Sequence, residues 1–91
     1  MAKSITMERI NDEIIQEIDR QYKIWGVQSH SNVYWLAILA EEFGEAAMAV
    51  LAPDHNKNPK TTQFHDSNIR TELIQIIAVC YNWIRDSDAA E

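Results

Sequence analysis

Four glutamates in two segments carry the strongest sign of chemistry in this sequence. Glu41, Glu42 and Glu45 fall within one short stretch, and Glu72 follows after a long interval. On a helix the first three carboxylates span roughly 100° of the circumference. Glu42 and Glu45, at i and i+3, repel each other, with no basic residue on the same predicted helix. The side that carries these glutamates is otherwise apolar, with Trp35, Ile38 and Ala49 on it.

Glu72 stands in a still more apolar segment. Residues 73–84 are apolar almost all round a helix, which predicts a helix buried on most sides. The face of Glu72 also carries Ile69, Ile76, Val79 and Trp83. An ionised carboxylate in such surroundings must be protonated, paired with a cation or bound to a metal. Arg20 and Arg70 are the basic candidates, and neither lies on this face of the same helix.

A single hard cation could bind the glutamates of both segments and neutralise their charges. Two antiparallel helices can bring Glu42 and Glu45 opposite Glu72, as metal sites in helical bundles do. Oxygen ligands favour Mg²⁺ or Mn²⁺ over Zn²⁺, and Mg²⁺ keeps positions for water and substrate phosphates. The alternative, a solvated acidic face without a ligand, is the usual fate of a run of charges.

The segments around these glutamates resemble a known family. Glu41-Glu42-Phe-Gly-Glu45, followed by Glu72-Leu-Ile-Gln75, is similar to the Glu-Glu-x-x-Glu and Glu-x-x-Asp motifs of the MazG-like all-α nucleotide pyrophosphohydrolases. The flanking stretches 20–26, 35–42 and 70–79 resemble the compact MazG-like proteins of phages and bacteria. The resemblance covers roughly residues 14–84.

The resemblance implies an activity and a ligand set. It implies Mg²⁺-dependent hydrolysis of a nucleoside triphosphate between the α and β phosphates, giving a monophosphate and pyrophosphate. By motif position the metal ligands are Glu42, Glu45, Glu72 and Gln75, and Glu41 orients the site or helps to activate water. Mn²⁺ is a possible substitute for Mg²⁺.

Gln75 stands where the common motif has aspartate. A glutamine carbonyl can bind Mg²⁺ but brings no charge, so metal affinity should fall. Two other hypotheses therefore stay open. One is a nucleotide- and metal-binding module with weakened or lost turnover, and the other is a structural helical dimer without a ligand.

Candidate substrate contacts lie outside the acidic motifs. We expect aromatic side chains to stack on the base and cations to steady the leaving pyrophosphate. The candidates are Trp25, His30, Trp35, Lys57, Lys60, Arg70 and Asn82. Core packing is the alternative for the tryptophans and for Tyr22, and a buried hydrogen bond for Asn82. A zinc site of His30, His55 and His65 with Asp54 or Asp66 is a weaker alternative, because two of the histidines lie in a loop without fixed spacing.

Hydrophobic periodicity predicts the elements that position these residues. The sequence indicates one all-α domain over residues 1–91, with helices at 6–25, 32–51 and 67–85, a loop at 53–66 and a frayed tail at 86–91. Gly26 is expected to end the first helix in the left-handed conformation, and Ser31 or Asn32 to cap the second.

The helix at 67–85 is apolar almost all round, and the other two helices of one chain cannot cover it completely. We therefore expect a homodimer or tetramer that completes a core of the four-helix type. The expected core face of the second helix comprises Leu36, Leu39, Ala40, Phe43, Ala46, Ala47 and Val50.

Composition limits the function classes. With 14 acidic and 8 basic residues the net charge is −6, which argues against nucleic-acid polymers as partners. Two glycines and two prolines are too few for the turns of a β-sandwich or barrel. One cysteine allows no internal disulfide, and no apolar run is long enough for a membrane span, so a cytoplasmic location is expected.

Overall fold

The chain forms a layer of α-helices. The computed structural model describes residues 2–51 and 66–90, and their regular structure is entirely helical, as the sequence predicts. The helices are α1 (Ala2–Trp25), α2 (Asn32–Leu51) and α4 (Asp66–Ala89). The bounds of α2 match the prediction, whereas α1 begins earlier than expected. Most of the predicted loop at 53–66 lies outside the described residues.

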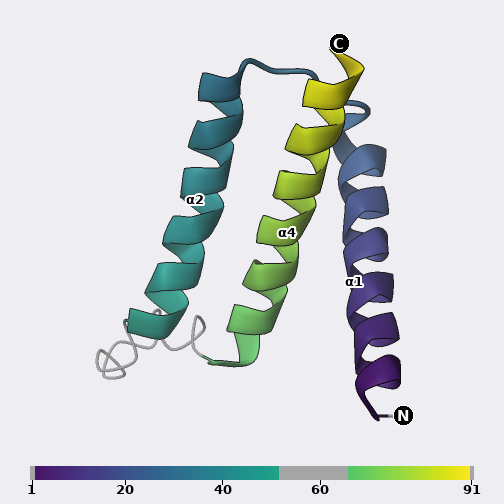
Figure 1. Ribbon diagram of the computed structural model, residues 1–91. Helices are drawn as coiled ribbons and strands as arrows, with labels where there is room; N and C mark the ends of the chain where they lie inside the picture. Colours follow the sequence, from purple (N-terminus) through teal and green to yellow (C-terminus); the bar gives the residue numbers. More distant parts are fainter. Residues whose placement is uncertain (1, 52–65, 91) are drawn as a thin grey trace.

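Helix α4 lies between the other two (Figure 1). It packs against α2 on one side and α1 on the other, while α1 and α2 barely touch. Along the chain α1 and α4 run in one direction and α2 in the other, so α2 and α4 are antiparallel (Figure 1). The molecule measures 49 × 39 × 20 Å, so it is flat. A flat arrangement leaves both sides of the central helix open.

Local capping fixes the turn between α1 and α2. Gly26 adopts a φ of 73°, and its amide donates to the Tyr22 carbonyl at 2.7 Å, which ends α1 as predicted. Ser31 then caps α2, because its hydroxyl oxygen accepts from the Tyr34 amide at 3.2 Å and its carbonyl from the Trp35 amide at 3.0 Å.

Helix α4 continues to Ala89 through residues predicted to be a frayed tail. Asp86 explains the difference, because it is 9% exposed and lies against the start of α2. Its Oδ2 accepts hydrogen bonds from the Trp35 indole Nε1 at 2.7 Å and from the His30 backbone amide at 2.8 Å. These bonds hold the pKa of Asp86 below its ordinary value. The last turns of α4 are therefore tied to α2.

The core face of α2 differs from the predicted one. Trp35, Ala46 and Ala49 are buried against the rest of the chain, and the small alanines allow close helix approach. Leu36, Phe43 and Val50, which the sequence assigns to the core, are 57%, 66% and 50% exposed. The reason is that α4 packs against the side of α2 that carries Glu42, so the most apolar side of α2 faces outward in the single chain.

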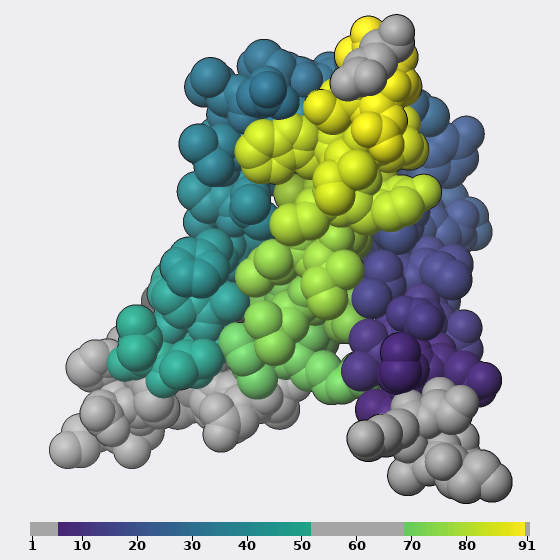
Figure 2. Space-filling view, viewed as in Figure 1, coloured from purple at the N-terminus to yellow at the C-terminus, as the bar shows by residue number. Residues whose placement is uncertain are grey.

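The exposed side chains of α2 continue onto α4. Glu41 and Gln75 line one pocket and mark one side of the α2–α4 pair. Successive residues of a helix are 100° apart, so the exposed apolar residues of α2 and α4 fall on the side away from Glu41 and Gln75. This apolar face comprises Leu36, Phe43, Val50, Leu73, Ile77 and Ile84. In Figure 2 the side chains of α4 stay in view over most of the helix between α2 and α1, which shows how open the layer is.

Among the described residues, no helix is both long and apolar enough to cross a membrane.

Replacing Asp86 by Asn should lower the melting temperature at pH 7, because a neutral amide is a weaker acceptor for Trp35 and His30. Since the folded pKa of Asp86 is depressed, its contribution is complete above the ordinary value of 3.8 and is lost as the pH falls through the folded pKa. The difference in melting temperature between the wild type and Asp86→Asn should thus become smaller as the pH falls. Thermal unfolding at several pH values measures it. Asp88→Asn, at an exposed position on the same helix, is the control and should change little.

Candidate metal and nucleotide site

Helices α2 and α4 bring the predicted acidic ligands together. Glu42 and Glu45 lie one helical turn apart on α2, and Glu72 lies on the antiparallel α4. One carboxylate oxygen from each lies within 4.8 Å of the other two. The predicted juxtaposition of Glu42, Glu45 and Glu72 is therefore present in the structure.

Two oxygens of this cluster are buried and have no partner. They are Oε1 of Glu42 and Oε1 of Glu72. Burial raises the pKa of Glu42, and the charges of Glu45 and Glu72 raise it further. The pKa of Glu72 is also raised, first by burial and then by the neighbouring Glu45 carboxylate. Without a cation these carboxylates are held in an unfavourable state.

The geometry suits a hard divalent cation. Oxygens on one Mg²⁺ are at most about 4.2 Å apart, since each bond is about 2.1 Å. Neighbouring oxygens on an octahedral ion are about 3 Å apart, so side-chain rotations would have to draw the three carboxylates closer together around the ion. A cation would satisfy both orphaned oxygens and remove the repulsion among the three acids, so the residues present fit Mg²⁺ or Mn²⁺.

A pocket of about 470 Å³ adjoins the cluster and shares Glu42 with it. This volume lies in the range of small-molecule sites. The other lining residues are Arg20, Gln21, Trp25, Gln28, His30, Tyr34, Trp35, Ile38, Glu41, Gln75 and Val79. The pocket thus has an acidic end at α2 and α4 and an aromatic end near the turn between α1 and α2.

Three of the predicted substrate contacts meet at the aromatic end. Trp35 is only 2% exposed and is fixed by its bond to Asp86. The His30 ring lies 5.0 Å from that of Trp35 and 4.4 Å from that of Tyr34, both edge-to-face. Its Nε2 is 2.9 Å from Gln28 Oε1. Trp25 is exposed and also lines the pocket, so a planar ring entering here would meet aromatic surfaces.

Glu41 and Gln75 line the same pocket. Glu41 is exposed, whereas Gln75 is half-buried. No hydrogen bond joins the Gln75 amide to another described residue, so the amide is available to a ligand. Its position near Glu42 is compatible with the metal-ligand role that the motif predicts.

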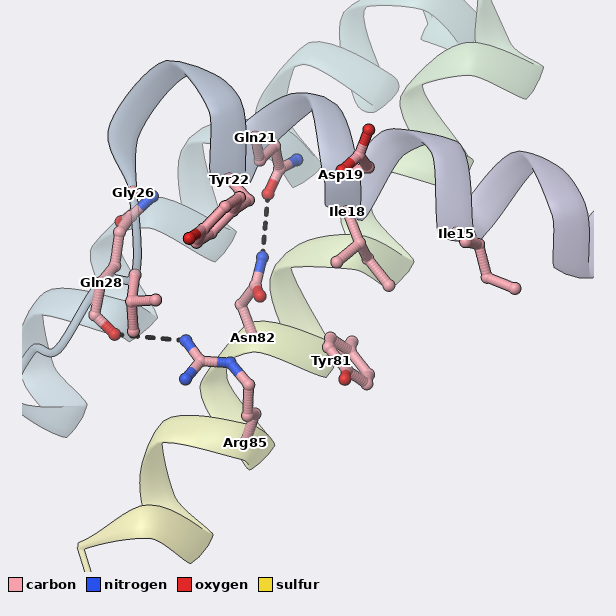
Figure 3. A pocket seen from close by; sticks show the side chains of 11 residues that line it. Ile15, Ile18, Asp19, Gln21, Tyr22, Gly26, Gln28, Tyr81, Asn82 and Arg85 are labelled. Carbon is pink, nitrogen blue, oxygen red and sulfur yellow. Dashed lines mark hydrogen bonds between the residues drawn. The ribbon is translucent and has the colours of Figure 1, made fainter.

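Two other predicted contacts lie away from this pocket. Arg70 pairs with Glu13 and so links α4 to α1. Asn82 donates from Nδ2 to Gln21 Oε1 at 3.0 Å and lines a separate pocket of about 350 Å³ between α1 and α4 (Figure 3). Tyr22 lines that second pocket as well. The predicted contacts Lys57 and Lys60, and the histidines His55 and His65, lie outside the described residues.

Sequence reasoning missed several residues of the site. Asp86 was assigned to the tail, although it continues the face of α4 that carries Glu72, Val79 and Trp83. That spacing is the signal that could have revealed it. The sequence suggests Arg20 only as a partner for Glu72, yet Arg20 lines the pocket that Glu42 also lines. Gln21, Gln28 and Tyr34 carry no sequence signal strong enough to single them out.

Comparisons with protein-family models, curated proteins and solved structures return no match for this chain.

Replacing Glu72 by Gln should stabilise the metal-free protein at pH 7.5 by about 1 kcal/mol, because it removes a buried charge. Since the pKa of Glu72 is raised above its ordinary value of 4.5, wild-type stability falls as the pH rises through the folded pKa. The advantage of the variant should therefore vanish toward pH 4.

With excess Mg²⁺ the wild type should be more stable than Glu72→Gln, because only the wild type keeps three carboxylate ligands. Urea unfolding with a chelator and with MgCl₂ measures both effects. Glu8→Gln, an exposed change on α1, is the control. Equal behaviour of the two variants in both buffers would contradict the metal site.

Proposed function

We propose that this protein is a Mg²⁺-dependent nucleoside triphosphate pyrophosphohydrolase that releases a monophosphate and pyrophosphate. One observation carries the proposal. Glu42, Glu45 and Glu72 converge with two buried, unpartnered oxygens beside a pocket large enough for a nucleoside. The resemblance of residues 41–45 and 72–75 to the MazG-like motifs supports the same assignment, because the motif glutamates are the ones that converge.

The residues of the pocket suit the parts of such a substrate. The aromatic end, with the exposed Trp25 and the His30 ring, would hold the base, and the acidic end would hold the phosphates through a divalent ion. When bound, Mg²⁺ would neutralise phosphate charge and lower the pKa of a bound water. Glu42, Glu45 and Glu72 would hold it, with the Gln75 carbonyl as a neutral fourth ligand.

Glu41 would handle the proton of the attacking water. Its carboxylate is exposed and lines the pocket next to Glu42. Water oxygen would bond to the α-phosphorus as the bond to the α–β bridging oxygen breaks, and Glu41 would accept the proton. Pyrophosphate would leave with the bridging oxygen, so atoms and charge balance without another reactant.

Gln75 favours a second candidate function. A neutral ligand in place of an acid weakens the hold on Mg²⁺, so a protein that binds nucleotide and metal with little turnover would have the same pocket. Stabilisation by nucleotide with Mg²⁺, in the absence of product, would support this candidate.

Pyrophosphate release from a panel of ribo- and deoxyribonucleoside triphosphates tests the proposal. We expect Mg²⁺-dependent release by the wild type and a loss of at least about 100-fold in Glu42→Gln and Glu72→Gln, which each remove a ligand. Glu8→Gln should match the wild type. If no nucleotide gives release above the ligand variants, the enzyme hypothesis is wrong. A rate gained by Gln75→Asp from an inactive wild type would favour the binding module.

We also propose that the chain forms a homodimer or tetramer through the apolar face of α2 and α4. Leu36, Phe43, Val50, Leu73, Ile77 and Ile84 are all at least 41% exposed. Contiguous apolar surface of this kind usually marks an interface, and a second copy would complete the core of the four-helix type. Because this face lies opposite the pocket, association leaves the pocket open.

Light scattering after size exclusion tests the interface. The wild type should have at least twice the mass of one chain at micromolar concentration. Phe43→Glu places a charge at the centre of the apolar face and should shift the protein to monomers. Ile24→Glu changes an exposed apolar residue of α1 outside this face and should leave the mass unchanged. A monomeric wild type would contradict the interface.

A further inference from the structure

Arg20 is the one lysine or arginine among the described residues that line the pocket beside the acidic cluster. We infer that Arg20 binds the pyrophosphate part of the substrate, that is, the β and γ phosphates of a nucleoside triphosphate. The inference rests on the proposed function and assigns a phosphate-binding residue that the acidic motifs do not provide. It also replaces Arg70, which is engaged by Glu13 away from the pocket.

The guanidinium of Arg20 is bound along one edge only. Its Nε donates to Glu17 Oε1 at 2.9 Å, and its Nη2 donates to Glu17 Oε2 at 2.7 Å. This side-on pair uses two of the five N–H groups. No other described residue accepts from Arg20, so both N–H groups of Nη1 and one of Nη2 remain. These groups form a second fork, whose geometry matches two oxygens of a phosphate.

Helix α4 helps to fix this guanidinium in place. Glu17 Oε2 also accepts from Gln21 Nε2 at 2.8 Å, and Gln21 Oε1 accepts from Asn82 on α4 at 3.0 Å. Gln21 is 8% exposed, and Figure 3 shows its bond to Asn82 across the two helices. The Glu17 side chain is 11% exposed, against 49% for Arg20. The anchor is therefore largely covered, while about half of the Arg20 side chain is exposed.

The pocket carries acidic side chains, so phosphate groups that bind there need a positive counter-charge. Glu41 and Glu42 line the pocket, and the negative field of Glu42 reaches Arg20. A triphosphate would be repelled by these acids wherever the divalent ion does not lie between them. Among the described side chains, Lys23 pairs with Asp19, and Arg85 donates to the Gln28 carbonyl. Arg20 is thus the available counter-charge for the phosphates beyond the metal.

Binding of inorganic pyrophosphate in MgCl₂, measured by isothermal titration calorimetry, tests the inference. Arg20→Gln should weaken pyrophosphate binding by about 10-fold or more, as expected for loss of charged hydrogen bonds. Arg9→Gln is the matched control, because Arg9 also pairs with a glutamate of α1 but lines no described pocket. It should bind as the wild type does. Arg20→Lys should be intermediate, since an ammonium keeps the charge but not the fork.

Steady-state kinetics on the same proteins separate the possible failures. With a hydrolysed nucleotide, Arg20→Gln should lower kcat/KM while leaving the Mg²⁺-induced rise in melting temperature intact. If wild type hydrolyses nucleotide and binds pyrophosphate, but Arg20→Gln and Arg20→Lys match Arg9→Gln in both assays, only the Arg20 inference is overturned. If wild type neither binds pyrophosphate nor turns over any nucleotide, the proposed function falls and this inference falls with it. A defect in Arg70→Gln alone would return the role to Arg70.

Discussion

Carboxylates of like charge repel one another at the α2–α4 interface. Glu42, Glu45 and Glu72 place three carboxylate oxygens within 4.8 Å of one another, and two carboxylate oxygens there are buried without a partner. Packing of Trp35 and the small alanines of α2 must hold the helices together against this repulsion. The cation proposed above would relieve this repulsion if it bound between the helices.

The sequence predicted the parts of this arrangement that depend on local chemistry. Gly26 and Ser31 fix the ends of α1 and α2 through backbone conformation and capping, which are properties of a few neighbouring residues. Glu72 was recognised because its own helix is apolar around it. The predicted core face of α2 was right for Ala46 but wrong for Leu36, Phe43 and Val50, because hydrophobicity favours the side of Phe43 while α4 packs against the side of Glu42.

The roles of Arg20 and Asp86 could not be predicted in the same way. Each depends on residues distant in sequence: Arg20 on a chain of bonds that reaches Asn82, and Asp86 on Trp35 and the His30 backbone. Such contacts follow from how α1 and α2 are placed on either side of α4. Spacing along one helix shows which residues share a face, but not which element will cover that face.

Residues of α4 serve every part of the site along a single strip. Glu72 belongs to the acidic cluster, Gln75 lines the pocket, and Asp86 fixes the aromatic end. The strip extends about 21 Å, at 1.5 Å per residue. Turning α4 about its axis would therefore disturb ligand charge, pocket shape and indole position together. These three contributions are therefore mechanically linked, because they are all carried by one rigid helix.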